Sequence, residues 1–165
     1  PGVGSFAEWD ERLDGLLGQA ILSIPGVKGV EFGEGFHSAE LPGSRLHDPI
    51  VVDGGRWTRP SNNAGGLEGG MSNGGEIRLR AVMKPIPTMK KGLPSFDTVS
   101  DRPCAGHSER SDVCAVPSAC VVAEAMAAWT VACAVTAQFG NDRMDDLAQR
   151  FASYKQRAER WNLHA

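Results

Sequence analysis

The feature that most constrains this sequence is a glycine-rich stretch at positions 62–75, which reads NNAGGLEGGMSNGG. It holds six of the chain's 20 glycines, and apart from Leu67 and Met71 its other residues are small or polar. Glycine has no Cβ and reaches positive φ, so backbone here can approach a flat ligand or another backbone closely. Exposed N–H groups in such a loop can also form an anion-binding concavity. The stretch therefore predicts a cofactor cradle or, as the simpler interpretation, a flexible linker or a cluster of tight turns.

The segment after this stretch alternates in polarity over residues 76–83, which predicts a half-buried strand. Its inward-facing positions are Ile77, Leu79, Ala81 and Met83. Next come Lys84, Pro85, Ile86, Pro87 and Thr88. Each proline removes a donor and fixes φ, so we expect a rigid extended strip outside the sheet that presents a lysine and a hydroxyl.

Length and composition favour one soluble globular domain over residues 1–165. The net charge of −3 gives no indication of nucleic acid or of an acidic membrane surface. Neither the four cysteines nor the four histidines have metal-binding spacing, so no metal site is predicted. Cys120 and Cys133 fall in an apolar helical segment, where buried free thiols are usual, and this favours a cytoplasmic location.

Secondary-structure signals predict an α+β fold. Ser5 and Glu8 form a capping box that would start a helix with Trp9 on its apolar face, ended by Pro25 and Gly26. Strands are expected over 27–32 and 50–52, the second with a turn at 53–55. Residues 89–113 show no periodicity and predict a long irregular loop.

Two further helices are expected in the last third of the chain. One runs from Pro117 to Gly140 and is apolar on nearly all sides, which favours a core helix, with a membrane span as the alternative. The other starts near Asp142 and Asp145, has a single apolar stripe, and is expected at the surface or between subunits.

The irregular segments carry the polar groups that a bound ligand would need. Pro25–Gly26, the glycine-rich stretch with residues 84–88, and residues 106–112 suit an anionic aromatic ligand, such as flavin mononucleotide (FMN) or another nucleotide. Asp112 beside Arg110 is a candidate proton-transfer group, and a simple ion pair within the loop is the alternative.

Five strings occur here in the order and spacing typical of one enzyme family: SIPGVKGVEFGEGF, NNAGGLEGGMSNG, KPIPT, RSDVCAVP and AEAMAAW. From about Gly2 to about Gly140 the chain resembles the C-terminal part of chorismate synthases, and its RSD string resembles the actinobacterial branch. The resemblance implies part of a β-α-β sandwich, with long helices packed on antiparallel sheet. We therefore expect the chain to be the C-terminal portion of a longer enzyme.

The resemblance also implies an activity. Chorismate synthases are lyases of the shikimate pathway, which makes the aromatic amino acids. They eliminate phosphate from 5-enolpyruvylshikimate 3-phosphate in an anti-1,4 sense, using reduced FMN that is not consumed. The family is associated with NADP, a cytoplasmic location and a homotetramer. Carried over by motif, the flavin contacts are Pro25, Gly26, Gly69, Lys84, Pro85, Ile86, Pro87, Thr88 and Arg110. Asp112 matches the aspartate that works with flavin N5 in removing a proton.

The chain also departs from the family pattern. The family's N-terminal half, with much of its basic substrate pocket, has no counterpart here. Pro25–Gly26 replaces Pro-Ala or Asn-Ala, and Ser111 stands where many relatives have histidine. Two competing interpretations follow. The chain could be a non-catalytic domain that serves only in assembly, or a general nucleotide-binding α+β domain, although it has no Walker or Rossmann fingerprint.

Overall fold

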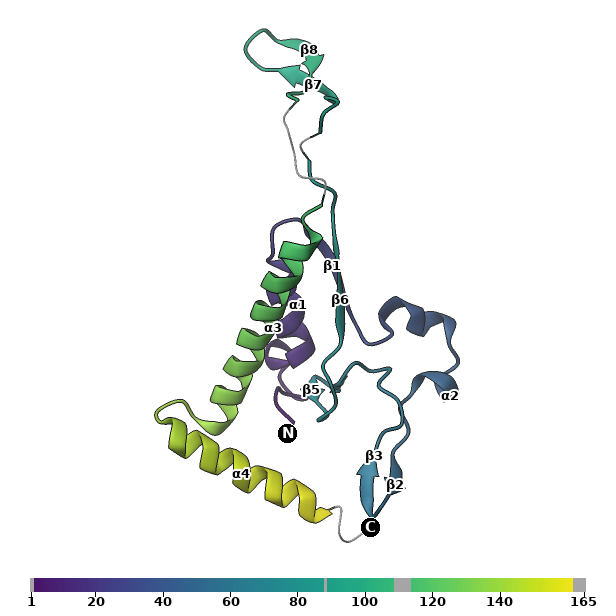
Figure 1. Cartoon of the computed structure of the whole chain (residues 1–165), viewed down its shortest axis with the longest axis vertical. Coiled ribbons are helices and arrows are strands. Elements are labelled where there is room, and N and C mark those ends of the chain that lie inside the picture. The colour runs from purple at the N-terminus through teal and green to yellow at the C-terminus, as the bar shows by residue number, and fades with distance from the viewer. Residues whose placement is uncertain (1, 88, 109–113, 162–165) are drawn as a thin grey trace.

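The computed structural model describes residues 2–87, 89–108 and 114–161, and Figure 1 shows how its elements are arranged. The centre is a pair of antiparallel strands, β1 (Val27–Phe32) and β6 (Leu79–Met83), beside two helices, α1 (Leu13–Leu22) and α3 (Val116–Phe139). Helix α1 contacts both β1 and α3 and so joins the strands to the longer helix. Helices packed on a small antiparallel sheet confirm the predicted α+β class.

Short elements surround this centre. The 3₁₀ helices are Trp9–Glu11 and Gly35–Glu40, and α2 is Gly43–Leu46. Antiparallel hairpins pair β2 (Val51–Asp53) with β3 (Arg56–Thr58), β4 (Leu67–Glu68) with β5 (Met71–Ser72), and β7 (Pro94–Asp97) with β8 (Arg102–Ala105). Helix α4 (Met144–Trp161) follows α3 after a turn.

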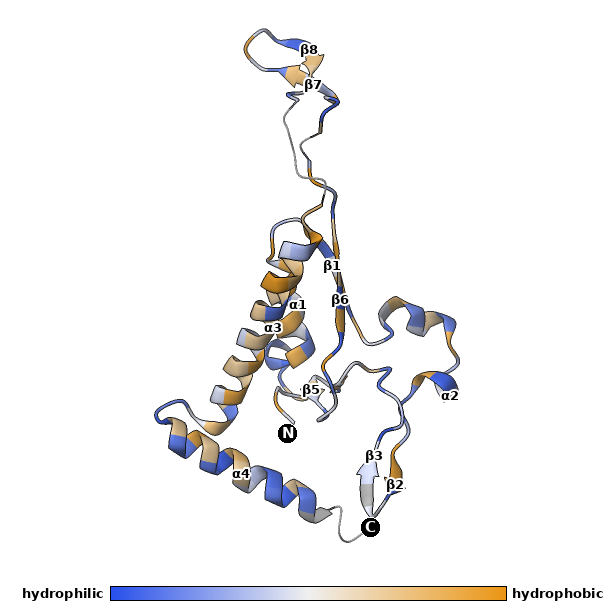
Figure 2. Cartoon of the chain, in the orientation of Figure 1, coloured by the Kyte–Doolittle hydropathy of each residue, from blue (hydrophilic) through white to orange (hydrophobic). Residues whose placement is uncertain are grey.

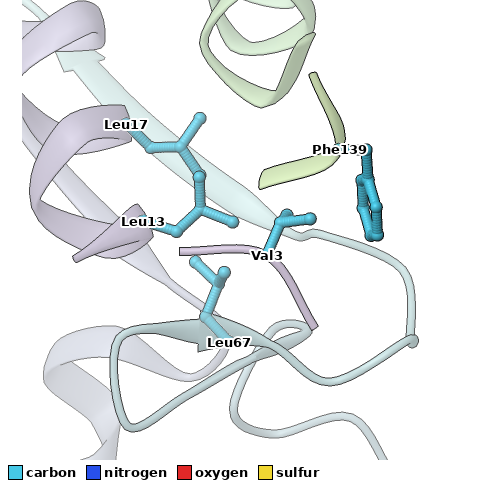
Figure 3. Packing of buried hydrophobic residues seen from close by; sticks show 5 residues of the cluster. All are labelled: Val3, Leu13, Leu17, Leu67 and Phe139. Carbon is cyan, nitrogen blue, oxygen red and sulfur yellow. The ribbon is translucent and has the colours of Figure 1, made fainter. Parts of the chain in front are cut away.

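The core consists of two neighbouring apolar clusters. The larger contains Val3, Leu13, Leu17, Leu67 and Phe139, and Figure 3 shows these side chains converging from α1, the N-terminal segment, β4 and the end of α3. The second contains Ile21, Ile24 and Val27. The apolar stripe expected on α4 packs against the larger cluster through Leu147, Phe151 and Tyr154. The same helix is otherwise mainly hydrophilic (Figure 2).

The predicted helix start was wrong: Ser5 makes the expected local hydrogen bonds, but it caps neither the 3₁₀ helix nor α1. The Ser5 hydroxyl oxygen accepts hydrogen bonds from the N–H groups of Ala7 and Glu8 at 3.2 and 3.1 Å. This turn leads only into a 3₁₀ helix, and Trp9 is 83% exposed. The α-helix begins at Leu13, whose N–H donates to the carbonyl oxygen of Gly70 at 2.8 Å. Contact with a distant segment therefore sets the start of α1.

Helix α3 was predicted to be buried on nearly all sides, and this was wrong for the described chain. One side contacts the core through residues such as Ala127 and Val131, while Val121 and Trp129 are exposed. Cys120 and Cys133, predicted buried, are also exposed. The reason is that α1 covers only one side of α3. By length and composition α3 is also the one described helix that could cross a membrane, a test that core helices pass as well.

The prediction of an irregular loop over residues 89–113 was wrong in part, because β7 and β8 form a hairpin there. The hairpin stands away from the body of the molecule (Figure 1). Its residues are exposed or only half-buried, with Asp97 accepting a hydrogen bond from the Val99 N–H at 2.8 Å in the turn. With no buried face, the strands have no reason to alternate in hydrophobicity, so these residues carry no periodic strand signal.

Candidate functional site

The glycine-rich stretch folds as a cluster of tight turns. Gly69 and Gly70 form the two-residue turn between β4 and β5, with φ values of +60° and +87°. Positive φ at both turn residues is typical of the hairpin turns that suit the right-handed twist of strands. A Cβ at Gly70 would collide with the carbonyl oxygen of Ser5, whereas one at Gly69 would meet nothing within 4 Å. Gly69 therefore presents open backbone at the tip of the β4–β5 hairpin.

A second part of the stretch packs against Gly33, which follows β1. The Gly33 N–H donates to the carbonyl oxygen of Arg78 at 2.9 Å, and a Cβ at Gly33 would overlap the carbonyl oxygen of Asn63. A Cβ at Gly65 would in turn overlap the Gly33 amide nitrogen. The absence of side chains at Gly33 and Gly65 thus serves backbone-to-backbone packing.

Asp48 anchors the start of the glycine-rich stretch. Its carboxylate accepts hydrogen bonds from the Ser61 hydroxyl at 2.5 Å and from the N–H groups of Asn63 and Ala64 at 2.8 and 2.9 Å. Partial burial raises the pKa of Asp48. These hydrogen bonds and the positive charge of Arg59 together lower it by more, so the pKa lies below the usual 3.8. Asp48 was not among the predicted site residues, because it lies 13 to 16 positions before its partners and no local pattern marks it.

Pro25, Gly26 and Lys84 come together at the end of the central strands. The Lys84 N–H donates to the carbonyl oxygen of Gly26 at 2.8 Å, which extends the pairing of β1 and β6 by one step. Gly26 has φ of +88°, and a Cβ there would touch the terminal methyl of Met83 at 3.1 Å. Lys84, Pro85 and Pro87 are exposed and Ile86 is half-buried. As predicted, residues 84–87 leave the sheet.

Gly69 lies apart from this group within the chain. Its neighbour Gly70 binds the first residue of α1, whereas Pro25 and Gly26 follow the last turn of the same helix. The helix has 10 residues, so at 1.5 Å per residue its ends are about 15 Å apart. A single ligand that touched Gly69 and Gly26 would have to extend along α1 over roughly that length.

The remaining predicted site residues, Thr88, Arg110 and Asp112, lie outside the described residues. Their assigned roles stay predictions, as do the flavin contacts of the residues described above. Among the described residues no group of three His, Cys, Asp or Glu side chains could hold a metal ion.

An open groove of about 1040 Å³ lies between β6 and α3. Leu79, Ala81 and Met83 line it from the strand. Helix α3 contributes mainly alanines, together with Cys120 and Glu124. The strand predicted over residues 76–83 begins three residues later than expected, at Leu79. The positions predicted to face inward line this groove, but Arg78 and Arg80, predicted to face the other way, line it as well.

Comparison with known proteins connects these features to one family. The family model described as chorismate synthase matches residues 1–136. Chorismate synthase of Moorella thermoacetica is 54% identical over 156 residues, which cover 94% of this chain and 41% of the relative. That of Pseudarthrobacter chlorophenolicus is 50% identical, over 93% of this chain and 39% of the relative. A crystal structure of chorismate synthase superposes with a TM-score of 0.75 at 41% identity, covering 93% of this chain and 39% of that one.

The fold and the glycine turns define an α+β protein in which helices pack on a short antiparallel sheet, with positive-φ glycines at both ends of β1. The chain belongs to the chorismate synthase family. It spans about two fifths of the length of the curated relatives it matches. The resemblance read from the sequence is therefore confirmed.

Proposed function

We propose that this chain supplies part of the flavin site of a chorismate synthase, the lyase that releases phosphate from 5-enolpyruvylshikimate 3-phosphate to form chorismate. The observation that carries the proposal is the family match over residues 1–136, which includes the glycine-rich stretch, residues 84–88 and Asp112. The complete enzyme would be a cytoplasmic homotetramer of the shikimate pathway, associated with NADP.

The described residues fit reduced FMN in two respects. Gly26 is half-buried beside Met83, and the Lys84–Gly26 hydrogen bond holds its backbone next to the exposed Lys84. Gly69 offers open backbone. When bound, the reduced flavin would supply electron density as phosphate leaves the substrate.

The chain's own residues would bind and position the reactants. Pro25 and Gly26 would let a planar ring approach the backbone, while Pro85 and Pro87, whose φ is fixed, would hold the backbone of the strip extended. Lys84 and Arg110 would balance negative charge, and Thr88 and Ile86 would contact the cofactor along the same strip. Asp112 would accept the proton removed from the substrate.

The test is a chimaera that joins this chain to the part of the Moorella thermoacetica relative that it does not match. With reduced FMN and 5-enolpyruvylshikimate 3-phosphate, the chimaera is expected to release phosphate and form chorismate. A folded chimaera that binds FMN without releasing phosphate would contradict the proposed reaction.

A second candidate is a non-catalytic assembly domain. It is favoured by one observation, the extensive exposed apolar surface of α3, which suits a chain whose main role is to contact other polypeptides. Titrating the folded chimaera with FMN and following flavin fluorescence separates the two, because an assembly domain would leave the fluorescence unchanged.

A further inference from the structure

The side chain of Glu68, at the end of β4, is held by two donors. Its Oε2 lies 2.8 Å from the Arg59 guanidinium and accepts a hydrogen bond from the Asn73 side-chain amide, also at 2.8 Å. Arg59 directly follows β3 and Asn73 directly follows β5, so the two donors reach one oxygen from different segments. The Glu68 carboxylate therefore has a defined position beside the turn at Gly69.

This carboxylate lies on the exposed side of the β4–β5 hairpin, together with the open backbone. Leu67 points into the larger core cluster (Figure 3). Successive side chains of a strand point to opposite faces, so Glu68 points away from the core. Glu68 and Gly69 are both exposed, and consecutive Cα atoms are about 3.8 Å apart. A ligand on the Gly69 backbone would thus lie within the distance of about 10 Å over which charges interact at 0.1 M salt.

Arg59 offsets the negative charge near this turn. It pairs with Glu68 and also interacts electrostatically with Asp48, so one cation stands between two carboxylates and the three groups carry one net negative charge. Arg12, which packs beside the same turn, already pairs with Asp14 at 2.7 Å. Without Arg59, two unbalanced carboxylates would lie near the open backbone.

Stability of the fold is the simpler explanation for the Arg59–Glu68 pair, but it accounts for little. The two side chains are 31% and 39% exposed, and exposed ion pairs contribute little to the free energy of unfolding. The hairpin is already held by the buried Leu67 and by the Leu13 N–H, which donates to the Gly70 carbonyl oxygen at 2.8 Å. The larger effect of the pair is therefore on a ligand that binds at the turn.

We propose that Arg59 holds and neutralises Glu68 so that the turn at Gly69 accepts the electron-rich ring of reduced FMN. This inference rests on the proposed function. Charge near the ring tunes the electronics of a bound flavin. An unbalanced carboxylate disfavours the reduced state more than the oxidised state, because the reduced ring carries more electron density. Arg59 acts through Glu68 and is thus a positioning residue.

The test is the reduction potential of FMN bound to the chimaera with the unmatched part of the Moorella thermoacetica relative. Arg59→Gln should weaken the binding of reduced FMN about fivefold relative to oxidised FMN, because Glu68 and Asp48 are left unbalanced. A tenfold change in this ratio corresponds to about 30 mV for a two-electron couple, so the potential should fall by about 20 mV. Equilibration with a reference dye measures the potential, and fluorescence titration measures the affinity for oxidised FMN.

Rescue of the charge separates this role from a structural one. Adding Glu68→Gln to Arg59→Gln restores the net charge of the wild type, so the potential should return to the wild-type value. Glu68→Gln alone should raise the potential because it removes a negative charge, and Arg59→Lys should change it little because the positive charge stays. The matched control is Arg143→Gln, at an exposed arginine 3.8 Å from Asp145, which should leave the potential unchanged.

Equal weakening of reduced and oxidised FMN by Arg59→Gln would overturn the proposal, because a turn that is merely loosened binds both states less well and leaves the potential unchanged. A double variant with a potential as low as that of Arg59→Gln would show that Arg59 does not act through Glu68. If circular dichroism shows that Arg59→Gln does not fold, Glu68→Gln still decides, since an unchanged or lower potential contradicts the proposal.

Failure of this inference is distinguishable from failure of the proposed function. A chimaera that binds FMN and releases phosphate, with one potential shared by all these variants, would refute the role of Arg59 and leave the proposed function standing. A folded wild-type chimaera that binds no FMN would refute both.

Discussion

At the scale of single residues, glycines with similar backbone conformations have different structural roles. Gly33 and Gly69 have φ values of +56° and +60°, yet only Gly33 is enclosed by other backbone. Gly33→Ala should therefore lower the free energy of unfolding by more than about 3 kcal/mol, because a backbone segment must move. Gly69→Ala should cost about 1 kcal/mol, the strain of a left-handed conformation alone. Urea denaturation measures both, and equal costs would contradict the packing role of Gly33.

Asp48 predicts a pH dependence of stability. Its folded pKa is lowered below the usual 3.8, so its ionised form contributes stability that is complete above the unfolded pKa and is lost as pH falls through the folded value. At pH 7, Asp48→Asn should lower the free energy of unfolding by on the order of 1 kcal/mol, since a charged acceptor of three hydrogen bonds is lost. The difference between wild type and variant should shrink below about pH 4.

The control for this prediction is an acidic residue that makes a different kind of contact. Asp145 forms an ion pair with Arg143 at 3.8 Å, and both side chains are exposed. Asp145→Asn should have a much smaller effect at pH 7, because surface ion pairs contribute little. A pH-independent difference for Asp48→Asn would show that its carboxylate does not stabilise the fold through its charge.

Lys84 predicts an effect on binding. In the folded chimaera, Lys84→Ala should weaken FMN or substrate binding about tenfold or more, since charged hydrogen-bond partners contribute over 1 kcal/mol. Lys28→Ala is the matched control, because Lys28 is exposed on β1 and outside the predicted site. Fluorescence titration and initial rates measure both affinities. Unchanged values for Lys84→Ala would reject its assigned role.

At the scale of elements, prediction from sequence succeeded where local signals were complete. β1 has the predicted bounds, since Pro25–Gly26 and Gly33 mark both ends. The long helix begins near Pro117 and ends before Gly140, which has φ of +95°. The start of α1 depends on Gly70, 57 residues later, so neighbouring residues do not predict it. The strands β7 and β8 have no buried face, so they show no alternation that would predict them. In the site, Gly26 and Lys84 were both predicted, and the structure places them in contact. Asp48 could not be predicted, because its role depends on contacts with residues far along the chain.

The β7–β8 hairpin predicts a pattern of proteolysis. The hairpin stands away from the body and its strands are exposed, so trypsin should cut first at Lys90 or Lys91, which are exposed just before β7. Arg150 should resist longer, because it lies in α4 and donates to the Phe139 carbonyl oxygen at 3.0 Å. Mass spectrometry of timed digests identifies the order. Early cleavage at Arg150 would show that α4 detaches from the body more readily than the hairpin unfolds.

At the scale of the whole molecule, the exposed side of α3 predicts self-association. Trp129 is 70% exposed, and Val121 and Val122 are exposed on the same helix. Trp129→Glu should reduce light scattering at high protein concentration without lowering the free energy of unfolding, because the side chain has little burial to lose. Tyr154→Glu serves as the contrast, since Tyr154 packs against the core and its loss should destabilise the chain. If Trp129→Glu unfolded the chain, Trp129 would have to be part of the core.

Tyr154 is the chain's single tyrosine. Its ring meets Phe139 edge-on with centroids 5.5 Å apart, and its hydroxyl oxygen accepts the Gly2 N–H at 3.3 Å. These contacts join the last helix to the end of α3 and to the first residues of the chain. Any signal specific to that phenol, such as its ring resonances in an NMR spectrum, therefore reports at one position whether three distant stretches of sequence are assembled.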